Sequence, residues 1–397
     1  MLEIVTGIFA SLIAALVISL VSKAVVQTGV LTRFNDKSKL LLFKSGSSFR
    51  KRVLANPQSA IKFFTRWLGR DQSLVGTHKG QFGKRASLME EKLFQTGKEK
   101  LKIKPRLYLT GWPCFILAEL NLGEKYLRRA VSGIKELLEG GSVKVYLGAT
   151  AKTPPDRQPR IVSYRHTIRA VQILVAMKRG KEIVAEVVGR MLDPKRGWQN
   201  KDSGWAQCDE EYTESDLWAS TYALKLLHAI HQRKVELPEK VHKSAKLAIS
   251  PTIDFLEREW RESGWAYGNA SSAHNGIQIV HETIWILKEY RPKLAQELLQ
   301  WVKTWLTPAT TVSELYYEEC PGVLRSSNDA RVSYALFQAG ESSDVWIHSY
   351  ESALSGFRAG VNCVDVAILL HLTFILAHSE QGRLSESLKE KQLLSAQ

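Results

Sequence analysis

Cysteine is scarce in this chain of 397 residues, and its four cysteines lie far apart with no Cys-x-x-Cys pair. This spacing excludes a disulfide framework and a zinc ribbon, and free thiols in a reducing compartment account for it. A Gly-rich phosphate loop and a nucleophile elbow are also missing. Stretches of period-two alternation are few, and residues 142–147 (SVKVYL) are the best candidate for a strand. The sequence therefore predicts a protein that is all-α or nearly so.

Charge is absent from residues 4–22, an apolar run about long enough to cross a bilayer. A cleaved signal peptide is the main alternative, but it requires a basic start and a shorter apolar core. A buried helix is a third alternative. A Lys- and Arg-rich region follows the run, which predicts an uncleaved single-pass anchor with its N-terminus outside and the bulk of the chain in the cytoplasm.

Acidic residues are rare between Arg33 and Arg106, where 19 Lys and Arg accompany 5 Asp and Glu. This stretch carries about +14 of the net charge of +15, and it fits a solvated linker or a segment that binds anionic lipid headgroups. Nucleic-acid binding is less expected, because no known motif accompanies the interleaved aromatic residues Phe63, Phe64, Trp67, Phe82 and Phe94. Residues 56–68 predict an amphipathic helix that lies along a membrane or packs on the main domain.

From about residue 107, apolar helical runs alternate with Gly-rich turns, and the alternation repeats about every 55 residues. A hydroxyl residue marks each repeat: Thr110, Thr167, Thr221, Thr283 and Ser333. Residues 361–378 close the series and are expected to lack a full partner helix. We therefore expect an anchor at 1–26, a basic juxtamembrane segment at 27–106, a helical-repeat domain at 107–380 and a polar tail at 381–397.

The repeats carry Gly-Trp loops ahead of a helix with a Thr, at Gly197-Trp198, at Gly204-Trp205 and at Gly264-Trp265. This pattern resembles the α/α-toroid proteins, and most closely the terpenoid cyclase and protein prenyltransferase repeat. The resemblance covers residues 107–379 and implies an (α/α)6 toroid of helix pairs with a site in its central cavity.

The catalytic signatures of these families are not matched. The Asp-x-Asp-Asp acid of the cyclases is absent, and the acidic residues near Asp209 have the wrong spacing for Asp-Asp-x-x-Asp. The lanthionine cyclases share the toroid, but where they have a zinc-binding Cys this chain has Ala266.

Candidate site residues come from the loops before the helices. Asp209, Glu210 and Glu211 are candidates for acid–base catalysis, although carboxylates before a helix also stabilise its dipole. Cys208, Asp209 and His274 are the candidate zinc ligands, by analogy with the prenyltransferases. Candidates for ligand binding are Trp198, Trp205, Trp218, Trp265, Tyr267, His274, Asp329 and Arg331. Structural packing is the alternative for the Trp residues, and His228 and His281 fit core or cavity-wall positions.

Three functions remain open at this point. The first is a membrane-anchored toroid that binds a ligand or protein partner without turning it over, as a sensor or effector. The second is an enzyme acting on isoprenoid or other lipid substrates, and the third is a glycosidase or lyase with two carboxylates across the cavity. The missing signatures favour the first, and fold analogy does not decide among them.

Overall fold

The computed structural model describes residues 46–74, 79–83, 107–146, 160–193, 197–209, 214–265, 272–304, 306, 321–357 and 362–394. Most of these residues are helical, which confirms the prediction of a nearly all-α protein. The strands pair antiparallel in two short sheets, β1 (Lys144–Tyr146) with β2 (Arg160–Val162) and β3 (Trp205–Ala206) with β4 (Ser215–Asp216). The predicted strand at 142–147 contains β1.

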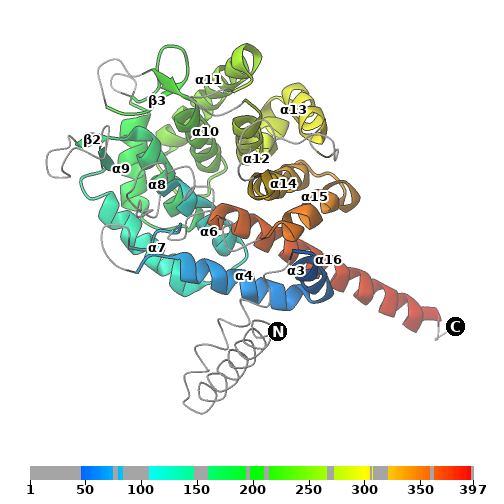
Figure 1. Ribbon diagram of the computed structural model, residues 1–397. Helices are drawn as coiled ribbons and strands as arrows, with labels where there is room; N and C mark the ends of the chain where they lie inside the picture. The colour runs from blue at the N-terminus through cyan, green and yellow to red at the C-terminus, as the bar shows by residue number, and fades with distance from the viewer. Residues whose placement is uncertain are drawn as a thin grey trace, which may run out of the picture.

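Six helices form a closed ring in which each packs against the next in chain order and the last packs against the first (Figure 1). We call these the ring helices: α6 (Leu107–Glu119), α8 (Tyr164–Ala176), α10 (Leu217–His231), α12 (Ser272–Tyr290), α14 (Pro321–Gln338) and α16 (Cys363–Leu394). They are rich in buried residues, and α8 is buried without interruption from Thr167 to Val175. A helix buried on all sides lies inside a protein, where it needs neighbours around its whole circumference.

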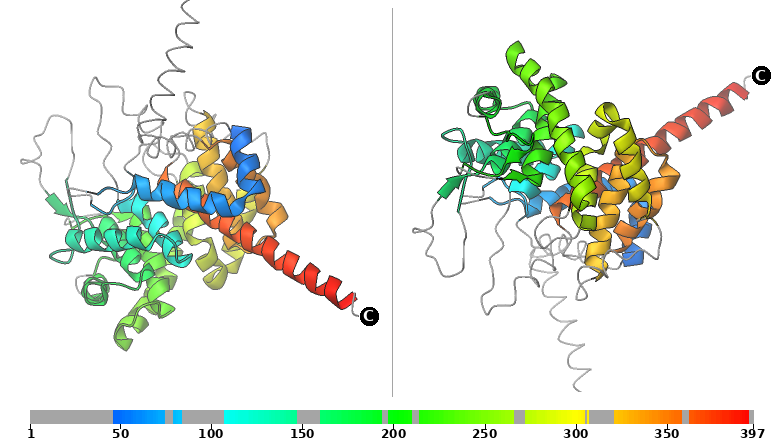
Figure 2. Two further views of the ribbon diagram at one scale, coloured as in Figure 1. Left: turned by 90° about the horizontal axis from the view of Figure 1, so that it is seen from below. Right: turned by 90° about the horizontal axis from the view of Figure 1, so that it is seen from above.

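A flanking helix follows each of the first five ring helices and packs against it (Figure 2). The flanking helices are α7 (Glu124–Leu137), α9 (Lys181–Met191), α11 (Glu239–Ser263), α13 (Pro292–Thr304) and α15 (Ser343–Ser355). In α7 the buried residues Leu127, Ala130 and Ile134 recur at three- and four-residue steps, so one stripe faces the ring while the opposite side is exposed.

Local capping explains where several helices begin. The side chain of Asp216 accepts a hydrogen bond from the Ala219 N–H at 2.6 Å and caps α10, and Ser163 caps α8 in the same way. Asn56 caps α4 (Pro57–Asp71), whose first residue is a proline that has no N–H to leave unpaired. The start of α4 matches the helix predicted at 56–68 to within a residue.

The hydroxyl residues that mark the repeats are all fully buried. Thr110 accepts a hydrogen bond from the Phe82 N–H at 3.0 Å, and Thr167 accepts one from the Val143 N–H at 2.9 Å. In the next repeat Ser220, beside Thr221, accepts from the Trp205 N–H. Thr110, Thr167 and Ser220 thus pair backbone N–H groups of the incoming segment, which would otherwise be buried without a partner, while Thr221 and Thr283 donate to carbonyls of their own helices. The repeated Thr is a structural feature of the connections.

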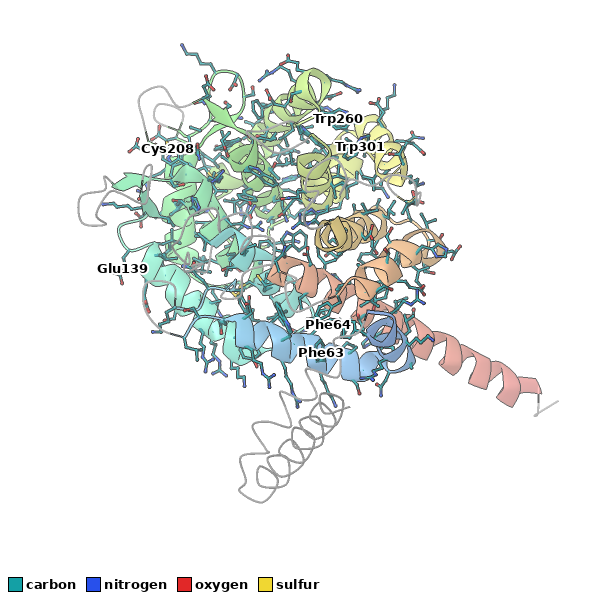
Figure 3. The ribbon with its side chains drawn as sticks, in the orientation of Figure 1. Phe63, Phe64, Glu139, Cys208, Trp260 and Trp301 are labelled. Carbon is teal, nitrogen blue, oxygen red and sulfur yellow. The ribbon has the colours of Figure 1, made fainter. Side chains whose placement is uncertain are left out.

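The sixth flanking position is filled from the other end of the chain. α4 packs along α16, and α3 (Gly46–Ala55) packs against α15. Phe49 stacks on Phe357 with ring centroids 4.5 Å apart, and Phe64 lies 5.9 Å from the same ring, beside Phe63 (Figure 3). The expectation that the last ring helix lacks a full partner was therefore wrong, because the partner lies about 300 residues earlier in the sequence.

The amphipathic helix expected at 56–68 corresponds to α4, and its apolar residues Ile61, Phe64 and Leu68 are buried against the ring. Of its two expected roles, packing on the main domain is the one observed. The apolar run at 4–22 lies outside the described residues. Within the part of the chain that the structure describes, no helix is both long enough and apolar enough to span a bilayer.

A substitution in α4 tests whether this helix closes the ring. Phe64→Ala removes a fully buried ring from the contact between α4, α3 and α15, and we expect it to lower the free energy of unfolding by about 3–5 kcal/mol. Lys62→Ala on the exposed side of the same helix is the control, with an expected change within about 0.5 kcal/mol. Urea denaturation of the detergent-solubilised protein measures both, and equal effects would contradict the packing of α4.

Candidate functional site: a buried charge cluster at the centre of the ring

Charged and aromatic side chains from all six ring helices meet inside the ring. We call this group the central cluster: Trp112, Arg169, Lys225, His281, Glu282, Arg331 and Asp365. Its charged members are almost fully buried, with side-chain exposure from 1% for Arg169 to 10% for Lys225. Charged side chains are rarely buried to this extent unless they are paired, so the cluster is the first place to look for function.

Glu282 is the hub of the cluster. Its Oε1 accepts hydrogen bonds from Trp112 Nε1 at 2.6 Å and from Arg169 Nη2 at 3.2 Å. Its Oε2 accepts a hydrogen bond from Lys225 Nζ. Trp112 lies on α6 and Glu282 on α12, which are separated by two other ring helices on either side. These bonds therefore cross the middle of the ring, whose centre is filled by side chains at this level.

Arg169 is held in place on several sides. Its Nη1 donates to Gln172 Oε1 at 2.9 Å, and its guanidinium group stacks over Phe115 and over Tyr222, 4.5 Å from the Tyr222 centroid. Gly111 makes this position possible, because a Cβ there would lie 2.4 Å from Arg169 Nε. Any larger residue at position 111 would push the guanidinium away from Glu282.

Burial and ion pairing act against each other on the two charges at the hub. Burial raises the pKa of Glu282, but Arg169 and Lys225 outweigh burial and hold that pKa well below its usual range. Burial lowers the pKa of Lys225 to about 8 even though Glu282 raises it, and its ammonium lies 4.4 Å from the centroid of the Trp112 ring. Both groups are charged at pH 7, so the hub is a buried network of two cations and one carboxylate.

His281 stacks on Trp112 with ring centroids 5.0 Å apart. Burial lowers its pKa to about 3, and although the charge of Glu282 raises this pKa, burial outweighs it and the charges of Arg331 and Lys225 act in the same direction as burial, so the ring is neutral. The Ile277 carbonyl also raises this pKa, but neither ring nitrogen has a partner of hydrogen-bond geometry among the described residues. A buried imidazole with two unbonded nitrogens leaves an available donor and an available acceptor.

Arg331 is the third cation of the cluster. Its Nε lies 3.5 Å from Asp365 Oδ1, and neither Nε nor Nη1 makes a hydrogen bond within the described residues. Tyr334, one turn further along α14, hydrogen-bonds His371 Nδ1 at 2.9 Å, and His371 lies 3.8 Å from the exposed carboxylate of Glu119. The buried charges of the described cluster are therefore three cations and two carboxylates.

The tryptophans expected at a ligand site pack instead as structural residues. Trp205 is fully buried and donates from Nε1 to Thr252 Oγ1 at 2.9 Å, while Trp198 stacks on Tyr164 with centroids 4.3 Å apart. Trp265 donates from Nε1 to the Leu256 carbonyl and contacts Trp260, which in turn contacts Trp301 between α11 and α13 (Figure 3). Trp218 is partly exposed, and its ring lies 6.0 Å from that of Tyr222.

The expected acidic and metal-binding residues are only partly within the described chain. Asp209 is exposed and accepts a hydrogen bond from the Tyr164 hydroxyl at 2.9 Å. Cys208 is buried, and its backbone forms an isolated bridge with Ser163 (Figure 3). Cys114 and Cys363 are also buried, and none of these three cysteines forms a disulfide among the described residues. Glu210, Glu211, Tyr267 and the side chain of His274 lie outside the described part. In that part, no group of three His, Cys, Asp or Glu side chains is arranged to hold a metal ion.

Asp329 and Arg331, both expected as ligand-binding residues, point to different partners. Asp329 accepts a hydrogen bond from Ser352 Oγ at 2.6 Å and so connects α14 to α15. Arg331 reaches Asp365 across the gap to α16. Among the residues predicted for ligand binding, Arg331 is the member of the central cluster.

The hub residues Trp112, Arg169, Lys225 and Glu282 were not predicted from the sequence. Their signal is visible in retrospect: each charged residue interrupts an apolar helical run, at residues 168–177, 217–230 and 276–290. Such a residue within a helix buried on all sides has no exposed face to occupy, so it must find a partner inside the protein. Which partner it finds depends on the closure of the ring.

No family model matches the chain, and no curated protein matches it. The central cluster is therefore interpreted on its own geometry.

Removing the charge of Glu282 tests the hub. Glu282→Gln leaves Arg169 and Lys225 buried without their shared carboxylate, and we expect the free energy of unfolding to fall by about 3–5 kcal/mol in urea denaturation. The matched control is Glu289→Gln on the same helix, where the carboxylate is exposed and 3.8 Å from His228. It is expected to change stability by less than about 1 kcal/mol. A similar effect of both substitutions would contradict the hub role of Glu282.

The pH dependence of stability tests the environment of His281. Its pKa is about 3 in the folded protein against 6.5 in the unfolded chain, so only the unfolded chain takes up a proton as the pH falls below 6.5. The stability present above pH 6.5 is therefore lost toward pH 3, by about 2 kcal/mol between pH 7 and pH 5. His281→Phe keeps the stacking on Trp112 and removes the titration, and we expect the loss between these two pH values to shrink by that amount.

The control for this experiment is His348→Phe at an exposed position on α15. Denaturation curves at pH 7 and pH 5 are compared with those of the parent protein, which retains the other buried histidines. An unchanged difference between the two pH values in His281→Phe would show that His281 is not held neutral by burial.

Proposed function

We propose that this chain is a membrane-anchored (α/α)6 toroid that binds an anionic ligand at its central cluster, without turning it over. The observation that carries the proposal is the charge of the cluster. Among the described residues, Arg169, Lys225 and Arg331 face only two buried carboxylates, Glu282 and Asp365.

The toroid is supported by the order in which the helices pack. Ring helices contact their neighbours and close from α16 to α6, and flanking helices pack outside them (Figure 2). The sixth flanking position is taken by α4, so six helix pairs account for the architecture that the Gly-Trp repeats suggested. The proposed site lies where this architecture brings the ring helices together.

An anionic ligand is supported by the energetics of buried charge. Removing an ion pair from water costs desolvation free energy, and the attraction between the charges offsets that cost only if every charge has good partners. An unmatched buried charge costs several kcal/mol. Arg331 has the least favourable environment of the three cations, since its pair with Asp365 is long and two of its nitrogens make no hydrogen bond. A ligand anion beside Arg331 would offset that cost, and the empty cluster would be the less stable state.

The chemistry of the donors narrows the class of ligand. A guanidinium group presents N–H donors in a planar fork that fits a carboxylate or a phosphate. The charge of Arg331 lowers the pKa of His281, which shows that the two side chains are near each other. The neutral His281 ring can donate a hydrogen bond from one nitrogen to the same anion. We propose a carboxylate or phosphate group as the recognised part, contacting the cluster from one end of the ring because the hub fills the centre.

The membrane anchor remains a proposal that is supported by the sequence alone. The uncharged run at 4–22 precedes the basic stretch that begins at Arg33, an order typical of an anchor whose following domain stays in the cytoplasm. A tethered ligand-binding domain of this kind suits a sensor or an effector at the membrane.

An isoprenoid enzyme is the second candidate, favoured by the aromatic rings that stand beside the cations. Phe115 and Trp112 lie within 5.0 Å of Lys225, and cations with aromatic faces suit a diphosphate joined to an apolar chain. These faces are already covered by Arg169 and Lys225, so they support binding less directly than the charge does. Turnover of a prenyl diphosphate by the purified protein would favour this candidate over the first.

The carbohydrate alternative has less support. A glycosidase needs a carboxylic acid whose pKa is raised so that it can donate a proton. The buried Glu282 is held in the opposite state, with its pKa well below the usual range because Arg169 and Lys225 stabilise the anion.

The proposed anion site is tested with inorganic pyrophosphate and with citrate as probes, titrated into the detergent-solubilised full-length protein by calorimetry. We expect one of them to bind and to raise the unfolding temperature, because a ligand that binds only the folded state stabilises it. Arg331→Met should weaken binding at least about tenfold and leave the unliganded protein as stable or more stable, since it removes a poorly paired buried charge.

Two further variants complete the test. Arg331→Lys keeps the charge and loses the fork, so we expect an intermediate affinity. Arg261→Met removes an exposed cation from α11 and should leave binding unchanged. Binding of neither anion, or equal affinity in Arg331→Met and the parent, would overturn the proposal.

A further inference from the structure

A second concentration of positive charge lies on the surface, away from the central cluster. Six exposed cations on α3, α4 and α7 have no acidic partner among the described residues, and we call them the basic face: Lys51, Lys62, Arg66, Lys125, Arg129 and Lys135. The cations nearby that do have partners use the acidic residues available, as in Arg128 with Glu124 and Lys79 with Glu136.

The basic face runs from α4 to α7 because the end of α4 meets the start of α7. Gln72 Nε2, just after α4, donates to the Tyr126 carbonyl of α7 at 2.8 Å, and Gly69 leaves room for the Tyr126 ring. Lys62 and Arg66 are one turn apart on the side of α4 that faces away from α16. Side chains tipped with nitrogen project from the same lower edge of α4 and α7 in Figure 3.

Anionic lipid and nucleic acid are the two polyanions that a basic face could bind, and the burial of the aromatic residues favours lipid. Binding of single-stranded nucleic acid without sequence preference uses exposed aromatic rings on which bases stack. Phe64, Trp67 and Phe82 are buried, and Phe63 is packed among Phe49, Phe64 and Phe357. Of the aromatic residues interleaved with the basic stretch, Phe94 lies outside the described part. The basic face therefore offers charge without stacking surfaces, which suits lipid headgroups better than bases.

The position of the face in the chain points to the same partner. The described chain begins at Gly46 with α3, which carries Lys51, and the uncharged run at 4–22 lies only about 25 residues earlier. In a domain tethered through this end, α3 and α4 are the first helices after the tether that the structure describes. Anionic lipids of a cytoplasmic leaflet attract basic side chains that come within about 10 Å of the surface.

We infer that the basic face of α3, α4 and α7 rests on the anionic surface of the membrane and so fixes the orientation of the domain relative to the bilayer. The inference relies on the proposed function only for the tether that brings the chain to a membrane. It does not depend on the ligand of the central cluster.

Lysine labelling tests the orientation. The full-length protein is reconstituted in nanodiscs of phosphatidylcholine, with or without phosphatidylserine, and modified with a soluble amine-reactive ester. Lys51, Lys62, Lys125 and Lys135 are expected to react about fivefold more slowly in the anionic discs, and high salt should restore their rates. The internal controls are Lys240, Lys243 and Lys246, which are exposed on α11 at the opposite side of Figure 1 and should react equally in both discs.

Paired charge reversals complete the test. Lys62→Glu with Arg66→Glu should return Lys51 and Lys125 to their rates in neutral lipid, whereas Lys243→Glu with Lys246→Glu should not. Equal labelling in both discs would overturn the inference. So would protection of the same lysines by added single-stranded RNA in neutral discs, which would assign the face to nucleic acid. Flotation with neutral vesicles tests the tether separately, so failure of the anchor and failure of the basic face give different results.

Discussion

The carboxylate of Glu282 is the interaction on which the middle of this structure depends. It accepts hydrogen bonds from Trp112 on α6, Arg169 on α8 and Lys225 on α10, while its own helix is α12. A carboxylate surrounded in this way tolerates little movement of the helices that supply its donors, because each lost donor leaves a buried charge without compensation. The hub therefore fixes the spacing of four ring helices at once, which apolar contacts alone specify less strictly.

Closure of the ring puts a second constraint on the chain. Among the described residues no flanking helix follows the last ring helix, and α4 packs against it from the N-terminal side of the domain. The two ends of the domain are thus joined by the phenylalanines of α3, α4 and the segment after α15. Folding of the last repeat must wait for a contact between distant parts of the sequence, which costs more loop-closure entropy than the contacts within each helix pair.

The sequence predicted structure well where it is determined by residues close together in the chain. The amphipathic period of residues 56–68 predicted α4 to within a few residues, and the side-chain cap from Asn56 explains that accuracy. It was uninformative where partners are distant in the chain. The amphipathic stripe of α4 was recognised, but its partner α16 was not, and the tryptophans of the loops were weighed as site residues although they brace the repeats. The charged residues inside the ring helices were the missed signal.

The two positively charged regions of the molecule, the basic face and the central cluster, differ in their exposure to water. The basic face is exposed, so dissolved salt screens it beyond about 10 Å, and its interactions are weak and sensitive to salt. The central cluster is buried, so its charges interact strongly with whatever replaces water beside them. Apolar residues in place of the cluster would fill the ring with less cost. The excess cation within the described central cluster is therefore the reason that we propose a ligand anion as its partner.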